Sequence, residues 1–463
     1  MEGIEGRPLS DVLVIIGAGP ARSSAIEASL RGAIIDGRLA PGTRLPSSRA
    51  LAADLGCARA TVVTAYEQLV AEGYLLARVG AGTTVASVGT PVALDLPEPD
   101  PRVFTELLPG EPDPSSFPRQ AWASTVRKVM QSSPDSLFGY GDRQGLGELR
   151  VALAGYLARS RSVVVDPGRV VIFGGFASAL STLAATFASL GIARVAVEDP
   201  GLPPHVRVIG AGGVDVVPVP VDDEGICIDD LGGARAVLCT PAHQFPTGVV
   251  LSAARRARLI EWARERDAWI VEDDYDGEFR YDRRPIGAMQ GLDPERVVYG
   301  GTASKSLAPG VGIAWLVLPP SLLEPVLDVT RVRRHAVSRI EQAALAHFIG
   351  SGHFDRHVRS QRLHYRRRRD ALVRLLAGRK DLLDVVGVSA GLHVTAFLRD
   401  RDEREILDTA RQRGIAMFGL GNHRIALPHR QGLVIGYSRS PAHAFPTALE
   451  ALQGVLDVLD VHR

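Results

Sequence analysis

The sequence predicts an α/β protein with three parts: an N-terminal helix-turn-helix domain, a large domain built on a mostly parallel sheet, and a smaller C-terminal α+β domain. Its 463 residues favour two or three domains, since a domain holds roughly 100–200 residues. From residue 137 onward, short β-branched runs alternate with amphipathic helical segments, as in parallel α/β sheets. Eight of the thirty prolines lie in one short stretch, which predicts an extended linker. The predicted boundaries are 21–87 for the helix-turn-helix, 88–118 for the linker, 119–325 for the large domain and 326–463 for the small domain.

Composition excludes several classes of protein. With 46% hydrophobic and 23% charged residues, the chain can bury a sizeable core, and no apolar run approaches the ~20 residues that span a bilayer. The 53 basic and 52 acidic residues nearly cancel, so a polyanionic partner must bind a local patch. Cys57, Cys227 and Cys239 are too few and too scattered for a disulfide framework or a metal site. We therefore expect a cytoplasmic protein with no membrane segment and no metal.

Seven apolar, β-branched runs predict the buried strands of the large domain. The segment from Ser252 to Arg266 predicts a helix between two of them. After Pro320 the pattern becomes mainly helical and rich in arginine, with four consecutive arginines at 366–369. The seven runs are Arg169–Phe173, Arg194–Val197, Val214–Val219, Ala236–Cys239, Trp269–Val271, Val297–Tyr299 and Ile313–Leu318.

Residues 21–87 contain two short helices joined by a tight turn. A Pro-Ser-Ser sequence at 46–48 precedes an apolar-periodic run that stops at Gly56, which predicts an N-capped helix. A second helix begins within three residues and ends at Gly73, so the pair forms a helix-turn-helix. The segment 74–85 predicts a two-stranded wing.

Arginine and hydroxyl side chains mark the surface of this domain that would meet DNA. The domain has only a small positive excess, but its arginines fall in turns and at helix starts, where a phosphate backbone is met. Two threonines of the second helix lie off its apolar face. The predicted DNA contacts are Arg44, Ser47, Arg49, Arg59, Thr61, Thr64, and Gly80 and Gly82 at the bend of the wing.

The stretches LRGAIIDGRLAPGTRLPSSRALAADLG and TVVTAYEQLVAEGYLLARVGAGTTV resemble the winged helix-turn-helix of the GntR superfamily. The resemblance implies binding to double-stranded operator DNA. Relatives usually read Ser-Arg-Thr-Thr-Val where this chain reads Ala58-Arg59-Ala60-Thr61-Val62. The first missing hydroxyl caps the helix and touches a phosphate in relatives, so its loss costs about 1 kcal/mol of capping or contact energy.

An alternative interpretation concerns the segment from Asp11 to Arg22, whose apolar run and Gly-Ala-Gly turn look like the start of a flavin-binding Rossmann domain. Arg22 replaces the third glycine of that motif. Residues from Leu30 onward belong to the winged helix, which leaves no second strand for a βαβ unit. We therefore do not favour flavin binding, and residues 1–20 have no assigned role.

One of only three lysines, Lys305, lies in a loop of small residues after a predicted strand. Ligands bind at the carboxyl ends of parallel strands, and a lysine held beside hydroxyls is the group that forms a Schiff base with an aldehyde cofactor. Another strand ends in Asp273, Asp274 and Tyr275. An aspartate there can pair with a pyridinium nitrogen, and a tyrosine hydroxyl can bond a phenolic oxygen. The sequence leaves open which of the two aspartates points inward.

Together with YGDRQGLGELRVALAGYL, VEDPG, TPAHQFPTG and HVRSQRLHYRRRRDAL, these segments make the chain from residue 110 onward resemble a fold-type I aminotransferase. Joined to the winged helix, the chain is similar to the MocR/GabR family of transcriptional regulators. The resemblance implies pyridoxal 5'-phosphate (PLP) as the cofactor. The implied roles are Lys305 as the Schiff-base lysine, Asp273 as the pyridinium partner, Tyr275 as the phenolic-oxygen partner, Thr302 as a phosphate ligand, and Phe176 and Ala177 as phosphate ligands through their backbone amides at a helix N-terminus.

The chain departs from the family pattern at the phosphate. Relatives usually have an arginine seven residues after the lysine, and this chain has Gly312 there. Loss of that charge-assisted donor costs about 1.5–3 kcal/mol. Residues 175–178 read Gly-Phe-Ala-Ser in place of Gly-Ala-Gln-Gln, and Leu202 stands where an aromatic residue is common. The candidates to replace the missing arginine are Arg331, Arg333 and Arg334.

These features favour a transcriptional regulator, and not an enzyme, whose aminotransferase-like domain senses PLP together with an amino acid or amine. A ligand with different affinities for two arrangements of the DNA-binding domains would shift operator occupancy. The alternative is an active PLP-dependent aminotransferase with an appended winged helix, and the missing arginine argues against its turnover. Because fold-type I pockets are completed by a second subunit, we also expect a homodimer.

Overall fold

The structure, a computed structural model, consists of two compact units, Met1–Pro99 and Asp100–Arg463. The structure does not describe three parts of the chain that were discussed above: residues 1–20, Gly80 and Arg334. No helix within those residues is long and apolar enough to cross a membrane. The described ranges are 23–78, 82–87, 105–282, 286–333, 337–428 and 430–461.

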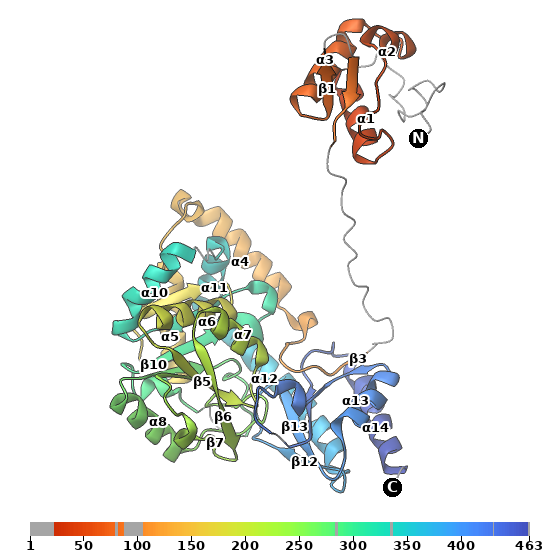
Figure 1. Ribbon diagram of the computed structural model, residues 1–463. Helices are drawn as coiled ribbons and strands as arrows, with labels where there is room; N and C mark the ends of the chain where they lie inside the picture. Colours follow the sequence, from red (N-terminus) through yellow and green to blue (C-terminus); the bar gives the residue numbers. More distant parts are fainter. Residues whose placement is uncertain are drawn as a thin grey trace. The chain divides into compact units, whose positions relative to one another are not determined.

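The N-terminal unit is a winged helix-turn-helix (Figure 1). Apolar residues at helical spacing, such as Ile26, Val62 and Leu69, are fully buried because each helix turns one face toward a shared core. Two antiparallel strands, with Leu75 opposite Val85, form the wing. The elements are α1 (Ser23–Ile35), α2 (Ser48–Asp54), α3 (Arg59–Ala71), β1 (Leu75–Arg78) and β2 (Gly82–Val85).

The second unit is built on an eight-stranded, mostly parallel sheet, which confirms the predicted fold class. In order across the sheet the strands are β4 (Val170–Phe173), β11 (Ala314–Val317), β10 (Val297–Thr302), β9 (Trp269–Asp273), β8 (Ala236–Cys239), β5 (Arg194–Asp199), β6 (Asp215–Asp222) and β7 (Gly225–Ile226). All seven predicted runs form strands of this sheet. Strand β11 is antiparallel to both of its neighbours, β4 and β10, whereas β5, β6, β8, β9 and β10 run parallel to one another.

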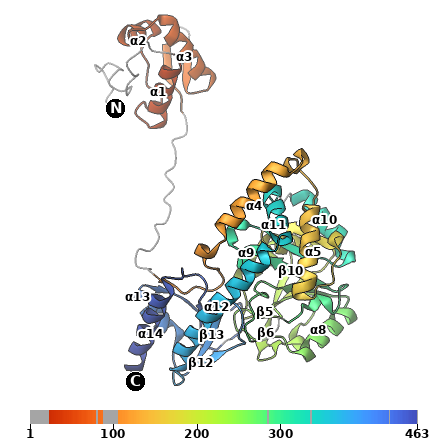
Figure 2. The same ribbon diagram turned by 180° about the vertical axis from the view of Figure 1, so that it is seen from behind.

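Helices cover both faces of this sheet (Figures 1 and 2). They are α4 (Arg119–Ser132), α5 (Gly147–Arg161), α6 (Phe176–Ser189), α7 (Pro203–Ala211), α8 (Ala253–Glu265), α9 (Ala303–Ser306), α10 (Pro320–Arg333) and α11 (Arg339–Gly350). Successive residues of a strand point to opposite faces. Val171 and Phe173 therefore pack with α6 and α10, whereas Val170 and Ile172 pack with α5 and α11.

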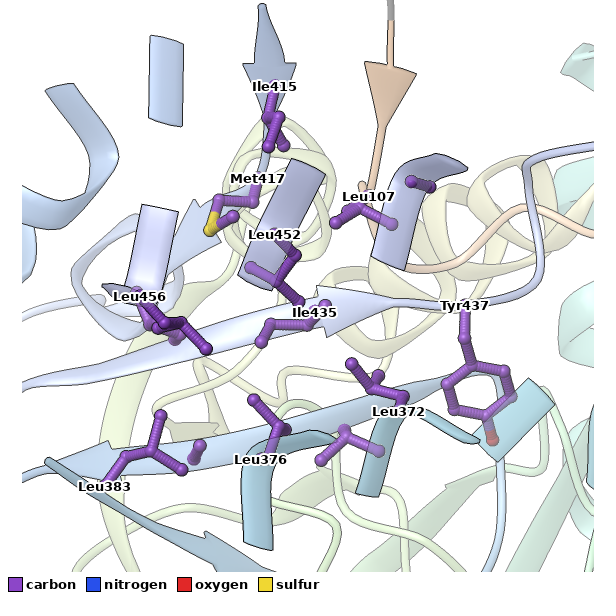
Figure 3. Close-up of a cluster of buried hydrophobic side chains, with 14 of the residues drawn as sticks. Leu107, Leu372, Leu376, Leu383, Ile415, Met417, Ile435, Tyr437, Leu452 and Leu456 are labelled. Carbon is purple, nitrogen blue, oxygen red and sulfur yellow. The ribbon is translucent and has the colours of Figure 1, made fainter. Parts of the chain in front are cut away.

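A smaller antiparallel sheet forms the C-terminal part of this unit. Its strands, in order, are β12 (Leu383–Val386), β13 (His393–Leu398), β16 (Gly432–Gly436) and β15 (Phe418–Gly419). The helices packed against it are α12 (His353–Ala377), α13 (Glu403–Gln412) and α14 (Phe445–Val461). Figure 3 shows this core, with Leu372 of α12, Ile435 of β16 and Leu452 of α14 side by side. Helix α12 joins the two domains, because its Phe354 packs in the core of the large domain.

The observed boundaries differ from the predicted ones at two places. Residue 325 falls inside α10, which packs on α6 of the large domain. The linker was predicted to extend to residue 118. The structure does not describe residues 88–104, but from Thr105 onward the chain belongs to the second unit. The strand β3 (Thr105–Glu106) pairs with β14 (Ile415–Ala416), and Leu107 is fully buried in the small-domain core (Figure 3). The prolines of 105–118 concealed this packing, since its partners lie some three hundred residues further along the chain.

Candidate cofactor pocket and DNA-reading surface

A cavity of about 400 Å³ opens at the carboxyl ends of β5, β8, β9 and β10, the edge at which open α/β sheets bind ligands. Glu198, Cys239, Asp273 and Thr302, which lie at or beside the ends of these strands, line it. Residues from α7 and from the small domain complete its walls, among them His205 and Ile425.

Lys305 and Asp273 face this cavity from neighbouring elements. Asp273 ends β9, opposite Gly300 of β10, and Lys305 lies on α9 directly after β10. Burial raises the pKa of the Asp273 carboxyl well above its usual value, although the nearby Lys305 opposes that shift. Burial also lowers the pKa of the Lys305 ammonium. Among the described residues no hydrogen bond reaches the Asp273 carboxylate, and its nearest basic group is His205 Nδ1 at 3.9 Å. The two side chains are thus held apart from water with their polar groups available to a ligand.

Asp274, the neighbour of Asp273, has a different environment. Its carboxylate accepts hydrogen bonds from Arg161 Nε at 2.6 Å, from Arg161 Nη2 at 2.7 Å and from the Tyr299 hydroxyl at 2.7 Å. Arg161 and Asp274 are both buried. Adjacent residues of an extended chain point to opposite sides, so Asp273 faces the cavity and Asp274 a structural ion pair. This geometry resolves the choice that the sequence left open.

The Tyr275 hydroxyl also lines the cavity, 3.1 Å from His243 Nδ1. The same nitrogen lies 2.8 Å from Asp276 Oδ2. Phe245 lines the cavity beside Tyr275, and its ring makes edge contacts with His393 and His423 of the small domain. Burial lowers the pKa of these two histidines to about 3 and about 4. The rings of this wall are therefore uncharged near neutral pH, although the cavity lining also includes Glu111, which lies 3.4 Å from Arg439 of the small domain.

The other end of the cavity meets the N-terminus of α6. Gly175 precedes that helix at φ +134°, and a Cβ there would meet no atom within 4 Å. No side chain caps the helix, and the buried Ser178 hydroxyl has no hydrogen-bond partner among the described atoms. Thr302 and Ser304 add hydroxyl groups to the cavity lining. Together these groups form a set of neutral hydrogen-bond donors suited to an anion.

Phe176 and Ala177 occupy this end differently from what the resemblance implies. The Phe176 ring lines the cavity, 5.3 Å from the His205 ring between centroids. Ala177 is exposed and is absent from the cavity lining, so any contribution it makes comes from its backbone. The ring of Phe176 thus takes up space that the sequence analysis assigned to backbone amides.

No arginine lines the cavity within the described part of the chain. Gly312 lies outside the lining at φ +60°. The suggested replacements are elsewhere, since Arg331 pairs with Asp328 at 3.0 Å and Arg333 donates to the Ser181 hydroxyl at 2.7 Å. The suggestion that Arg331 or Arg333 clamps a phosphate is wrong, because α10 turns both side chains away from this cavity.

Sequence reasoning missed several polar residues of the lining, namely Glu111, Glu198, His205 and Thr240. Glu198 accepts hydrogen bonds from the Thr240 amide at 3.1 Å and the Thr240 hydroxyl at 2.6 Å, and burial raises its pKa to about 7. His205 is buried beside Asp273, and burial lowers its pKa to about 4. Glu198 stands in the VEDPG stretch quoted above, so its position at a strand end was the available signal. His205 follows on α7, and only the tertiary structure brings it to β9.

On the winged helix, the predicted DNA contacts differ in exposure and in local role. Arg44, Arg49 and Arg59 are exposed, as is Thr64, and Thr61 is half-buried. Ser47 caps α2 by accepting from the Ala50 amide at 3.2 Å, whereas Ala58, at the corresponding position of α3, makes no side-chain cap. Gly82 has φ +88° and lies against the Arg44 guanidinium, where a Cβ would come within 3.2 Å of Nε. The structure does not describe Gly80.

The fold and cavity define an aminotransferase-like protein that carries a DNA-binding module. Residues 110–430 match the family "Aminotransferase class I and II", and residues 22–85 match "Bacterial regulatory proteins, gntR family". The chain belongs to the aminotransferase class I and II family, with a gntR-type domain at its N-terminal end. The aminotransferase class I and II fold is a PLP-dependent family.

Curated relatives share the fused architecture and are HTH-type regulators. The chain is 35% identical over 438 residues to the probable rhizopine catabolism regulatory protein MocR of Rhizobium meliloti, covering 88% of each chain. It is 32% identical over 415 residues to the pyridoxine biosynthesis regulator PdxR of Corynebacterium glutamicum, covering 88% of this chain and 90% of the relative. An archaeal alanine:glyoxylate aminotransferase has the same fold as 76% of this chain, with a TM-score of 0.70 at 24% identity over 91% of its own length. The chain is therefore a member of the GntR/MocR-type regulators.

Proposed function

We propose that this protein is a transcriptional regulator that binds operator DNA through its winged helix and PLP through its aminotransferase-like cavity. The observation that supports cofactor binding is that Lys305 and Asp273 face one cavity while their polar groups remain without hydrogen-bond partners among the described residues. Burying an amine and a carboxyl in this way costs free energy, and a ligand that contacts both recovers it. Because operator DNA is in the cytoplasm, we propose that location for the protein.

The residues present fit PLP. When bound, PLP supplies an aldehyde that primary amines attack. Lys305 is the amine of this chain that would hold the aldehyde carbon, Asp273 would keep a proton on the pyridinium nitrogen, and Tyr275 would donate to the phenolic oxygen. The Thr302 and Ser304 hydroxyls and the first backbone amides of α6 would donate hydrogen bonds to the phosphate, without help from an arginine. That neutral set weakens the phosphate contact relative to relatives with an arginine, by about ten- to a hundredfold in affinity.

The sensing step rests on population shift. An amine or amino acid that took the place of Lys305 on the aldehyde carbon of the cofactor would leave the Lys305 side chain as a free amine, and so change its charge in a buried site. If the two arrangements of the dimer differ in affinity for this ligand, binding shifts their ratio and so the occupancy of the operator. The uncharged aromatic wall at Phe245 and the absence of an arginine from the described lining favour an amine over a carboxylate-bearing amino acid.

Visible absorption of the purified protein tests cofactor binding. Lysine-bound PLP is coloured, so wild type should show a band that Lys305→Ala lacks. Borohydride reduction followed by peptide mass spectrometry should place the cofactor on Lys305. Lys128→Ala and Lys380→Ala are matched controls, because they remove the only other lysines, both exposed. A Lys305→Ala protein that keeps the band and traps cofactor covalently would refute the assignment.

The second candidate, an active aminotransferase, is favoured by the family to which the large unit belongs. Many turnovers with any pair of amino acid and keto acid would support it. The missing arginine at Gly312 and the aromatic wall both weaken retention of charged substrates, so we expect at most single turnovers.

We further propose that the regulator is a homodimer. Met130, Phe138, Tyr140 and Val151 are large apolar residues that stay exposed on α4, α5 and the connection between them. Large apolar residues exposed on neighbouring segments of the chain are what an interface would cover. A chain that begins at Thr105, and so keeps β3 and Leu107, should remain dimeric in light scattering. A monomer at micromolar concentration would show that assembly depends on the N-terminal unit.

A further inference from the structure

Helix α12 carries a basic stripe whose role the cofactor pocket and the winged helix leave unexplained. Residues 353–380, which include the helix, hold ten basic and two acidic residues, whereas the whole chain has a net charge of only +1. The charge of the protein is therefore concentrated on this one element. Figures 1 and 2 show the helix lying between the large and small sheets.

The helix separates its residues into a buried face and a charged face. Phe354, Val358, Tyr365, Leu372 and Leu376 are buried in the two cores. At 100° per residue, the exposed arginines fall on the opposite side of the helix. We call these five residues the arginine stripe: Arg356, Arg359, Arg366, Arg367 and Arg374.

The arginine stripe makes no close ion pairs within the described part of the chain. None of its five guanidinium groups has an ion-pair partner among the described residues, whereas arginines such as Arg255, Arg264 and Arg399 elsewhere in the unit pair with carboxylates. The two acidic residues of the helix contact other arginines: Asp355 lies 3.8 Å from Arg159 of α5, and Asp370 lies 4.0 Å from Arg369. Like charges along one helix face destabilise it, so a polyanion that neutralised the stripe would recover that free energy.

The dimensions of the stripe match a DNA backbone. Eighteen residues separate Arg356 from Arg374, which at 1.5 Å per residue is about 27 Å. Along the duplex axis that length corresponds to about eight base pairs. Because the strands wind around the axis, a straight helix faces only those phosphates on the side of the duplex turned toward it. The guanidinium group is also the side chain best suited to phosphate recognition.

The length of chain between Ser87 and Thr105 limits how far a duplex bound by the winged helix can lie from the second unit. Seventeen residues lie between Ser87, which follows the wing, and Thr105 at β3. That length limits the separation of these two residues to about 60 Å. DNA held by the winged helix therefore has flanking duplex available to the second unit.

We propose that the arginine stripe of α12 is a second DNA-binding surface, which contacts the phosphate backbone beside the site read by the winged helix. This inference rests on the proposed DNA-binding function. It assigns to the aminotransferase-like unit a direct contact with DNA, independent of base sequence. A cofactor-dependent change in that unit would then act on the DNA itself as well as on the winged helices.

The test is the salt dependence of binding to a random-sequence DNA duplex of roughly 40 base pairs, long enough for both surfaces. Full-length wild type is compared with the variant Arg359→Gln, Arg366→Gln, Arg367→Gln and Arg374→Gln by fluorescence anisotropy. The slope of log K against log[salt] should become shallower by about 0.9 for each phosphate that the variant no longer neutralises, or about 3–4 in all. A protein with Arg49→Ala and Arg59→Ala alone should keep some binding to this duplex through the arginine stripe. Adding the four glutamine changes should remove that remaining binding.

Matched controls separate charge from folding. Arg258→Gln with Arg266→Gln removes two exposed arginines, one in the middle of α8 and one at its C-cap, and should leave the slope unchanged. Arg366→Gln with Arg367→Gln should flatten the slope, whereas Arg366→Lys with Arg367→Lys, which keeps the charge, should retain it. The comparison of the Gln and Lys double variants at Arg366 and Arg367 tests the proposal even if the fourfold variant fails to fold.

Unchanged slopes in the folded glutamine variants would overturn the inference. A loss confined to an RNA duplex of the same length, with DNA binding intact, would overturn it too. Either result would leave the proposed regulator function standing, because that function fails only if Arg49→Ala and Arg59→Ala have no effect on operator binding.

Discussion

The winged helix and the aminotransferase-like cavity hold their functional side chains in opposite ways. The predicted DNA contacts Arg44, Arg49 and Arg59 are exposed, and each is placed by the turn or helix start next to it in sequence. Lys305 and Asp273 are largely enclosed and are placed by neighbouring strands of a sheet. A surface arginine can therefore change with little effect on stability, whereas in the cavity binding and stability are coupled.

The largest expected effect separates two adjacent aspartates. Asp274→Asn should lower the free energy of unfolding by about 3–5 kcal/mol, because it leaves buried Arg161 without its ion-pair partner. Asp273→Asn should cost little or stabilise the ligand-free protein, because it replaces a buried, unpaired carboxyl. Urea denaturation followed by tryptophan fluorescence measures both, since all four tryptophans lie in the second unit.

The same pair should separate in cofactor binding. Asp273→Asn is expected to weaken PLP binding or shift its visible band, and Asp274→Asn to leave the band unchanged where the protein is folded. Equal losses of stability in the two variants would show that the assignment of the inward-facing carboxyl is incorrect.

On the DNA side, Arg59→Ala should weaken specific operator binding by about 1–3 kcal/mol if the side chain makes a bidentate base contact. Arg49→Ala should weaken binding to all sequences and flatten its salt dependence, as a phosphate contact does. Neither change should alter the thermal transition of the protein, because both side chains are exposed. Binding isotherms on a genomic fragment that wild type retains measure the effect, and unchanged isotherms for both variants would contradict the assigned surface.

The two units should also differ in their response to pH. Burial raises the pKa of Glu198, Glu272 and Glu278 to about 7 in the second unit. A raised pKa means that the folded state binds more protons than the unfolded state. The stabilising contribution is therefore complete below the ordinary pKa near 4.5 and is lost as the pH rises through 7. Each of these carboxyls should lower stability by up to about 1.4 kcal/mol per pH unit in this window.

Calorimetry between pH 5 and 8 tests this difference. Below pH 6.5 the buried histidines His205, His393 and His423, whose pKa values are lowered, oppose the glutamates, because they favour the folded state as the pH rises. Above pH 6.5 only the glutamates act, so the transition of the second unit should move to lower temperature as the pH rises from 6.5 to 8, and Glu198→Gln should flatten the trend. In the winged helix, hydrogen bonds from Gln68 and Arg31 lower the pKa of Glu72, so its transition should hold steady over the same range. A second unit that gains stability between pH 6.5 and 8 would contradict the prediction.

The smallest expected effect is restoration of a helix cap. Ala58→Ser should stabilise the winged helix by about 1 kcal/mol, because the N-cap of α3 has no side-chain hydrogen bond. Ala60→Ser is the matched control, since it adds the other missing hydroxyl inside the helix, where it caps nothing. In calorimetry, the transition temperature of the winged helix should be higher for Ala58→Ser than for wild type and unchanged for Ala60→Ser.

Much of this architecture could be predicted because it depends on local patterns. Seven β-branched runs identified seven strands of the large sheet, and the Pro-Ser-Ser signal identified the cap of α2 at Ser47. The small-residue loop around Lys305 and the carboxylates after β9 were visible as strand-end chemistry. The packing of Thr105–Leu107 was hidden, since the proline pattern around it indicates a linker and its partners are distant in sequence.

By itself the sequence determined the fold class, the two kinds of module and the residue types at the edge of the sheet, because periodicity and turn residues act over a few positions. Only the tertiary structure decided which aspartate faces the cavity, since that depends on Arg161 and Tyr299 occupying the other side of β9. It also excluded Arg331 and Arg333 from the phosphate end and brought His205 to Asp273. These are contacts between residues far apart in the chain, and the packing of helices on the sheet sets their distances and directions.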